Sequence, residues 1–206
     1  GLRASFGLFL KPMSADLGWG REVFAFAMAV QNLMWGATQP FASAIAEKWG
    51  AGRVVAFGGI LCGAGLVMMA YATDPLTLNL TAGVMIGMAQ AGGGLAVVLG
   101  AVARALPANR RTFGLGVVTA AGATGQFTVV PGAQALMTAG IDWLPALLIL
   151  ATSAVVIVAC GIPLAGKPNM QSAAENAVRR DLGLTAALRE ASGHRGYWLL
   201  TLGFFV

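Results

Sequence analysis

Five long windows without a charged residue constrain this chain more than any other feature. Each window is at least as long as the ~20 residues that an α-helix needs to cross the hydrocarbon core of a bilayer. The composition agrees, because 57% of the residues are hydrophobic and only 10% are charged, whereas soluble domains carry roughly 25% charged residues. The sequence therefore predicts an all-α membrane protein with five complete spans. The windows cover residues 23–46, 54–73, 75–103, 112–141 and 143–166.

The two ends of the sequence carry shorter apolar stretches, over residues 1–13 and 196–206. Each is too short to cross a bilayer alone, so we interpret them as parts of helices in a longer polytopic protein. We expect an N-terminal transmembrane half over residues 1–166, a central cytoplasmic linker over 167–195 and the start of a seventh helix over 196–206. The helices expected in the first part cover residues 1–13 (partial), 22–46, 53–73, 76–103, 112–139 and 143–165.

Lys and Arg gather in alternate loops, which predicts an orientation. Cytoplasmic loops of membrane proteins are enriched in these residues, so we expect the N-terminus and the linker on the cytoplasmic side. The net charge of +5 is then a topology signal, and no basic face suggests a nucleic-acid partner. The basic residues of the predicted cytoplasmic loops are Lys48, Arg53, Arg104, Arg110, Arg111, Lys167, Arg179, Arg180, Arg189 and Arg195.

Residues that bind metals or cofactors are scarce in this sequence. The two cysteines, Cys62 and Cys160, are far apart, and His194 is the only histidine. One His and two separated Cys do not make a metal site. We therefore predict no metal, no cofactor and no catalytic site, and a packing role for both cysteines.

Arg3 is the one charge that we expect inside the hydrocarbon core. If the first helix ends near Met13, Arg3 lies ~15 Å below the surface at 1.5 Å per residue, close to the midplane. An Arg at that depth costs about 2.5–3.5 kcal/mol on insertion scales and usually faces a bundle interior or a wet cavity. Gly1, Ser5 and Gly7 leave room beside it. We expect Arg3 to bind an anion, and a buried Arg satisfied by backbone carbonyls is the alternative.

Amide side chains occur in some predicted helices and not in others. The second helix carries Gln31, Asn32 and Gln39, the fourth carries Gln90 and the fifth carries Gln126, whereas the third and sixth carry none. This contrast predicts that helices one, two, four and five line a polar space, although hydrogen bonding between helices would also explain each amide. The predicted substrate-binding residues are Arg3, Gln31, Asn32, Gln90 and Gln126.

The segment between the second and third predicted helices, residues 43–53 (SAIAEKWGAGR), resembles a signature of the major facilitator superfamily, G-x-x-x-D-R/K-x-G-R-R/K. Glu47, Lys48 and Gly50 match it, Arg53 fits loosely, and Ser43 replaces the first Gly. In that family the loop acts as a latch on one transport state. The resemblance implies the same role for these five residues, and the alternative is an ordinary basic turn.

Further segments resemble the monocarboxylate-transporter branch of that family, including its oxalate/formate-type bacterial members. They are residues 1–13 (GLRASFGLFLKPM) followed by Gly18-Trp19, Gln39-Pro40 at the end of the second helix, and the loop that holds Arg110 and Arg111. The resemblance implies a major facilitator fold, with an N-terminal six-helix bundle built as a 3+3 inverted repeat. It also implies a bacterial plasma-membrane protein in which Arg3 binds the carboxylate of a small organic anion.

The function expected from this resemblance is secondary transport of a small organic anion, a monocarboxylate, by alternating access. The partners would be the substrate, the lipid bilayer and a C-terminal transporter half beyond this sequence. Proton coupling would need an acid from that second half, because the five windows hold no Asp, Glu or His.

Two other functions stay open. One is export of drugs or other solutes, since residues 122–132 are faintly like an antiporter motif, although an unneutralised Arg3 would repel cations. The other is a membrane-embedded sensor or enzyme, for which we find no nucleophile and base pair, metal cluster or intramembrane acid.

Overall fold

The computed structural model describes residues 2–162 and Gly193, without the side chains of Arg3 and Ala108. The predicted linker, apart from Gly193, and the predicted seventh helix lie outside the described residues. Throughout residues 2–162 every regular element is a helix, as the sequence predicts. The elements are α1 (Leu2–Leu17), α2 (Arg21–Trp49), α3 (Ala51–Ala70), α4 (Pro75–Leu78), the π-helix η1 (Asn79–Met85), α5 (Ile86–Gly93), α6 (Leu95–Ala105), α7 (Ala108–Thr138) and α8 (Trp143–Gly161).

Four described helical segments are long and apolar enough to cross a membrane: α3, residues 75–105, residues 109–138 and α8. The sequence predicts five spans, and the difference is α2. This helix has 29 residues, but Gln31, Asn32 and Gln39 lie within it, and their amides lower its mean hydropathy. Amides in the middle of a membrane helix usually meet other helices or a polar space.

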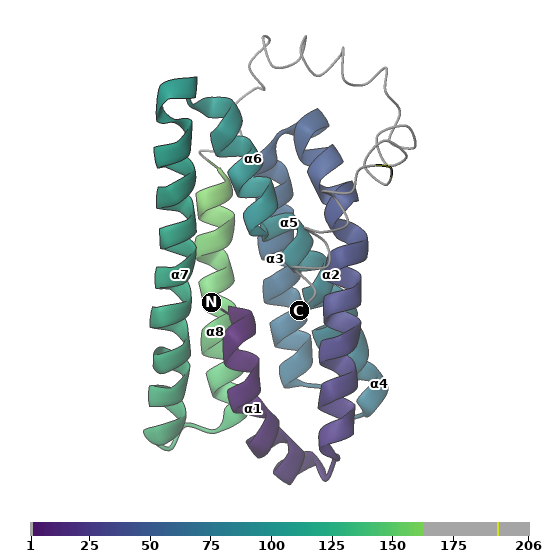
Figure 1. Ribbon diagram of the computed structural model, residues 1–206. Helices are drawn as coiled ribbons and strands as arrows, with labels where there is room; N and C mark the ends of the chain where they lie inside the picture. Colours follow the sequence, from purple (N-terminus) through teal and green to yellow (C-terminus); the bar gives the residue numbers. More distant parts are fainter. Residues whose placement is uncertain (1, 163–192, 194–206) are drawn as a thin grey trace. The chain divides into compact units, whose positions relative to one another are not determined.

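The helices of residues 2–162 pack side by side (Figure 1). α3 packs against α8 on one side and α5 on the other, α2 packs against η1 and α5, and α7 contacts α1, α6 and α8. Phe6, Phe9 and Met13 recur about every turn of α1 and are buried in the main core, which also holds Leu66 and Leu147. α1 is thereby held in the bundle by one apolar face.

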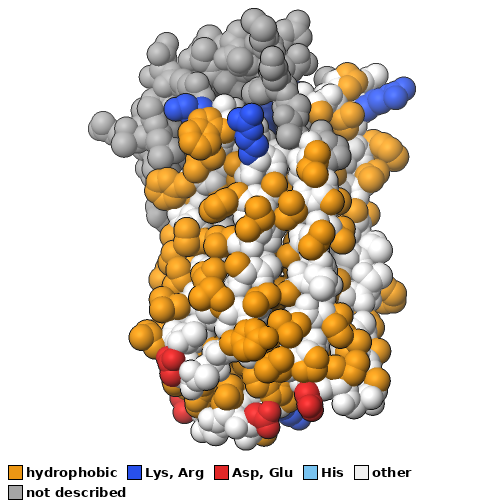
Figure 2. Space-filling view, turned by 180° about the vertical axis from the view of Figure 1, so that it is seen from behind, with side chains coloured by type: hydrophobic (Ala, Val, Ile, Leu, Met, Phe, Trp, Pro, Cys, Tyr) orange, Lys and Arg blue, Asp and Glu red, His pale blue; other side chains and the backbone are white. Residues whose placement is uncertain are grey.

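The surface has the charge distribution of a membrane-spanning bundle (Figure 2). Hydrophobic side chains cover its middle, and large ones such as Phe57, Ile60 and Phe127 are more than half exposed. Basic side chains gather at one end and acidic ones mainly at the other. We call these the basic end and the acidic end; the first holds Lys48, Arg53, Arg104, Arg110 and Arg111 with Glu47, and the second holds Asp16, Glu22, Asp74 and Asp142 with Arg21.

Short polar contacts fix the acidic end. The indole Nε1 of Trp143, at the start of α8, donates a hydrogen bond of 2.6 Å to Oδ2 of Asp16 at the end of α1. Asp74 caps α4 by accepting from the backbone N–H and the hydroxyl of Thr77, at 2.8 and 2.5 Å. Those bonds, the one from the hydroxyl first, hold the pKa of Asp74 below its usual value.

The fourth predicted helix, expected as one continuous helix over residues 76–103, is interrupted. α5 ends at Gly93, and Gly94 is extended (φ −72°, ψ 160°) before α6 begins. Three consecutive glycines weaken a helix, and α3 packs closely here, since a Cβ on Gly58 would lie 2.7 Å from the backbone nitrogen of Gly93. Earlier in the same span, residues 79–85 form a π-helix. This candidate membrane span therefore changes its backbone geometry twice.

Candidate functional site

Arg3 is the second residue of α1 and lies in its first turn. Ser5 and Phe6, which follow it, are 0% and 3% exposed. α1 continues to Leu17, beyond the end that the sequence predicts, so Arg3 lies about 21 Å from that end at 1.5 Å per residue, within a ~30 Å hydrocarbon core. One turn further, a Cβ on Gly7 would meet no atom within 4 Å. There is therefore open space along the side of α1 that carries Gly7, near the level of Arg3.

Gln31 is fully buried between two helices. Its Nε2 donates a hydrogen bond of 2.9 Å to the carbonyl oxygen of Ala82, in the π-helix η1. Its Oε1 is buried and has no hydrogen-bond partner among the described residues. A π-helix displaces backbone carbonyls from the usual helical pattern, and Gln31 satisfies one of them. Its described contact is thus structural and joins α2 to η1.

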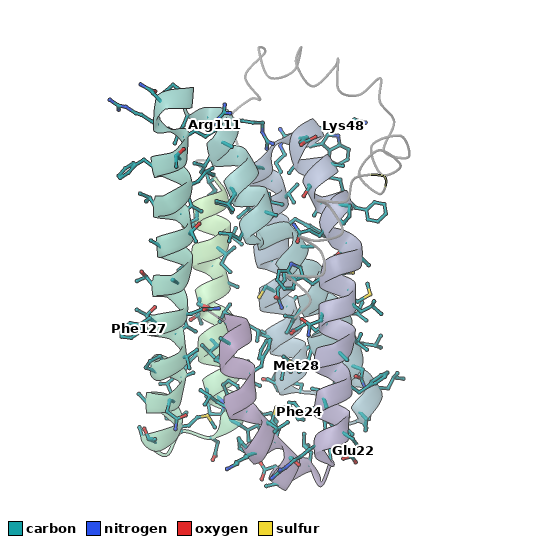
Figure 3. The ribbon with its side chains drawn as sticks, in the orientation of Figure 1. Glu22, Phe24, Met28, Lys48, Arg111 and Phe127 are labelled. Carbon is teal, nitrogen blue, oxygen red and sulfur yellow. The ribbon has the colours of Figure 1, made fainter. Side chains whose placement is uncertain are left out.

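Asn32 and Gln126 lie on exposed parts of their helices. Asn32 donates from Nδ2 to the carbonyl oxygen of Met28, one turn earlier in α2, at 3.0 Å. Gln126 is exposed on α7, and its neighbour Phe127 is 80% exposed and points away from the bundle (Figure 3). The structure does not bring these two amides together with Gln31.

Gln90 lies at the interruption of the fourth span and has an unexpected companion in Gln39. Both residues are half-buried, and the Nε2 atom of each is buried without a hydrogen-bond partner among the described residues. Oε1 of Gln39 is 3.6 Å from the place where a Cβ on Gly94 would sit, and Gln90 precedes Gly94 by one turn. We did not predict Gln39 as a site residue; its position directly before Pro40 was the available signal.

The predicted latch motif spans a helix end, a turn and a helix start. Ser43, Glu47 and Lys48 belong to the last two turns of α2, and Arg53 belongs to the first turn of α3. Gly50 alone separates the two helices, with φ of 98°, a conformation that strongly favours glycine.

Glu47 pairs with a residue that the motif does not contain. Its Oε1 lies 3.8 Å from NH1 of Arg104, at the end of α6, and the two side chains are 49% and 31% exposed. Arg110 and Arg111 are exposed in the first turn of α7, and Figure 3 places Arg111 at the same end as Lys48, opposite Glu22. Sequence reasoning missed Arg104 as a partner, because no spacing rule links the ends of α2 and α6.

The described residues offer no metal site, since they contain no group of three or more His, Cys, Asp or Glu that could hold an ion. Cys62 is buried and Cys160 is exposed, and both are free thiols.

Comparison with known proteins identifies the family. Mouse monocarboxylate transporter 11 is 32% identical over 184 residues, which cover 82% of this chain and 38% of the transporter. Rat monocarboxylate transporter 3 is 30% identical over 88 residues, which cover 43% of this chain and 18% of that protein. The chain thus spans well under half the length of these relatives. Residues 2–206 match the family described as Major Facilitator Superfamily, and the chain belongs to that superfamily.

Proposed function

We propose that the protein containing this chain is a secondary active transporter that moves a small organic anion, a monocarboxylate, by alternating access. The observation that carries the proposal is the similarity to mouse monocarboxylate transporter 11 over 184 residues, in a chain of the major facilitator superfamily. The apolar helices of the described bundle support membrane insertion. The remainder of the transporter would supply the other wall of the substrate path.

Arg3 is the proposed anchor for the carboxylate. The proposal is supported by the open space one turn away along α1, where a Cβ on Gly7 would meet no atom within 4 Å. All acidic residues of the described bundle lie near its ends, so none of them neutralises a charge at that depth. An arginine provides up to five donors and stays protonated at ordinary pH. It can therefore bind a carboxylate but cannot carry a coupled proton. A coupled proton would need an acid from outside the described helices.

The remaining predicted residues complete this proposal. Gln31, Asn32, Gln90 and Gln126 are the proposed polar residues of the substrate path. The part of Gln90 is supported by its buried Nε2, which has no acceptor among the described residues. Glu47 and its motif control the change between inward- and outward-facing states. The basic end faces the cytoplasm of a bacterial cell, in accordance with the positive-inside rule.

The decisive experiment compares uptake by the full-length protein and its variants in proteoliposomes. The probes are radiolabelled formate, acetate, lactate, pyruvate and oxalate. We expect uptake of at least one of these by the wild type and at least about a 10-fold loss in Arg3→Ala, because hydrogen bonds to charged groups contribute about 1.5–3 kcal/mol. Arg3→Lys should retain part of the uptake, since it keeps the charge.

A matched control is Lys11→Ala, which removes an exposed basic side chain from the same helix and should leave uptake unchanged. Equal uptake by wild type and Arg3→Ala would disprove the anchor role. Transport of a hydrophobic cation such as ethidium, with none of the five carboxylates, would show that the protein is an exporter.

A further inference from the structure

The interruption at Gly94 lies inside a helical segment that is long and apolar enough to cross a membrane, residues 75–105. At a break between helices, the last C=O groups of the first helix and the first N–H groups of the second have no intrahelical partner. Lipid cannot satisfy them, so irregular backbone at membrane depth is tolerated only where it is buried in protein or lines a water-filled cavity. The break between α5 and α6 therefore marks a place where polar groups are expected inside the bundle.

A second irregular position, in α2, faces this break. Pro40 lies within α2, and because proline has no N–H, the carbonyl of Gly36 lacks its usual helical donor. Gln39 directly precedes Pro40 and reaches the break, since its Oε1 is 3.6 Å from the Cβ position of Gly94. Two neighbouring helices thus depart from regular hydrogen bonding at the same level.

Two amide groups at this level have hydrogen-bond donors with nothing to bind. The Nε2 atoms of Gln39 and Gln90 are buried and without an acceptor among the described residues, although buried polar groups in proteins are nearly always paired. Gln31 shows the contrast, because its Nε2 lies in the same bundle and is satisfied by the carbonyl of Ala82. The donors of Gln39 and Gln90 thus lack an acceptor among the described residues, in contrast to the donor of Gln31.

The charge of the surroundings limits which ligand fits. In the described bundle, Asp and Glu lie near the ends, and Gln39 lies ten residues before Trp49, or ~15 Å from that end of α2 at 1.5 Å per residue. A pair of amide N–H groups without a nearby carboxylate favours a ligand that accepts hydrogen bonds and can be negatively charged. A carboxylate oxygen meets both conditions, and hydrogen bonds to charged acceptors are stronger than neutral ones.

We propose that Gln39 and Gln90 form an uncharged binding site for the substrate's carboxylate, a second station separate from Arg3. The inference rests on the proposed function, because it assumes that the substrate is a carboxylate. Both residues adjoin the break, because Oε1 of Gln39 lies 3.6 Å from the Cβ position of Gly94 and the backbone carbonyl oxygen of Gln90 lies closer still. Arg3 attracts the anion by its positive charge. The two glutamines bind the anion by hydrogen bonds alone, so no opposite charge holds it there.

The test measures binding of sodium acetate and sodium pyruvate to the purified full-length protein by isothermal titration calorimetry. We expect Gln39→Leu and Gln90→Leu each to raise the Kd for both ligands by about 10-fold or more, the effect of one lost hydrogen bond to a charged group. The matched control is Thr38→Val, because the hydroxyl of Thr38 already bonds the carbonyl of Met34 at 2.5 Å within α2. That variant should bind both ligands like the wild type.

If the leucine variants do not fold, Gln39→Glu keeps the shape of the side chain and replaces its donor with a negative charge. It should weaken binding of both ligands more than the loss of one hydrogen bond would. Wild-type affinity in Gln39→Glu, or in both leucine variants, would overturn the proposal, as would weakened binding of pyruvate alone, which would indicate recognition of the 2-oxo group instead of the carboxylate.

The same measurement separates this proposal from the function on which it rests. Suppose that the wild type binds acetate or pyruvate, that Arg3→Ala loses this binding and that the glutamine variants keep it. In that case only the second station is wrong. If the wild type binds neither ligand, the monocarboxylate assignment fails for these probes and the second station fails with it.

Discussion

Chemically identical amides have different roles in this bundle, depending on what lies opposite them. Gln31 donates to the carbonyl of Ala82 and is 0% exposed, so its described contact stabilises the contact between α2 and η1. Gln39, two turns further along α2, has a buried Nε2 for which the described part of the chain provides no acceptor. One helix thus carries both an amide that bonds a neighbouring helix and an amide whose donor has no acceptor among the described residues.

This difference gives a prediction for Gln31→Leu. The substitution removes the side-chain hydrogen bond to the carbonyl of Ala82, a net loss of about 0.5–1.5 kcal/mol, partly offset because the unpaired Oε1 of Gln31 is also removed. We expect a lower thermal unfolding temperature for the detergent-purified full-length protein. Gln134→Leu, which changes an exposed amide on α7, should unfold like the wild type, and equal stability of the two variants would show that the Gln31 bond contributes little.

The sequence predicts polar positions better than it predicts their partners. The five predicted substrate-binding residues each have a polar side chain in an apolar helix, a pattern that can be recognised in the sequence without knowledge of the fold. Whether Gln31 meets Ala82, or Glu47 meets Arg104, depends on how helices far apart in the sequence pack. Gln39 was left out of the predicted site for the same reason, because its relation to Gly94 exists only in three dimensions.

At the scale of the helices, the length of the apolar windows predicts the class of fold, whereas packing between helices determines where a helix is interrupted. The bilayer requires every spanning segment to satisfy its backbone internally, so long apolar windows imply helices, and the described residues are helical. The break between α5 and α6 was not predicted, since glycines in membrane helices more often mark close packing than an interruption. Here they do both, because Gly58 of α3 packs against the backbone of Gly93.

Adding a single methyl group at the break, in Gly94→Ala, should destabilise the protein. A Cβ on Gly94 would collide with the carbonyl oxygen of Gln90, so Gly94→Ala must displace the backbone, and overpacking of this kind costs typically about 1–3 kcal/mol. We expect a lower thermal unfolding temperature of the full-length protein. The matched control is Gly122→Ala in α7, where a Cβ meets nothing within 4 Å and where alanine favours the helix by about 1 kcal/mol; a loss of stability in both variants alike would contradict the prediction.

At the scale of the molecule, the two charged ends predict the orientation in the membrane. Basic residues dominate the end that holds Lys48, Arg53, Arg104, Arg110 and Arg111, and such ends remain in the cytoplasm. In a full-length variant with every native cysteine replaced, Cys62 and Cys160 included, we expect Arg111→Cys to react with a membrane-impermeant maleimide only in inside-out vesicles. Asp74→Cys should react in intact cells, and the reverse pattern would invert the proposed topology.

The ion pair between Glu47 and Arg104 belongs to the same scale, because it joins the ends of α2 and α6. The side chains are 49% and 31% exposed and the charged atoms are 3.8 Å apart, and exposed pairs of this kind contribute about 0–1 kcal/mol to stability. Its proposed effect is instead on the rate of switching, where a contact present in only one transport state shifts the balance between states. We expect Glu47→Gln to lower the maximal uptake rate several-fold, with little change in the Kd for the carboxylate or in the unfolding temperature.

Charge exchange provides the most stringent test of this pair. Arg104→Glu alone should slow transport, and the double variant Glu47→Arg, Arg104→Glu should recover part of the rate, because it restores an attraction with the signs reversed. Glu22→Gln, which neutralises an exposed acid at the opposite end, serves as the control and should transport at the wild-type rate. If Glu47→Gln raised the Kd at an unchanged maximal rate, the residue would act on substrate affinity. If the double variant were as slow as the two single variants combined, the two charges would act independently. The contact between α2 and α6 would then not control switching.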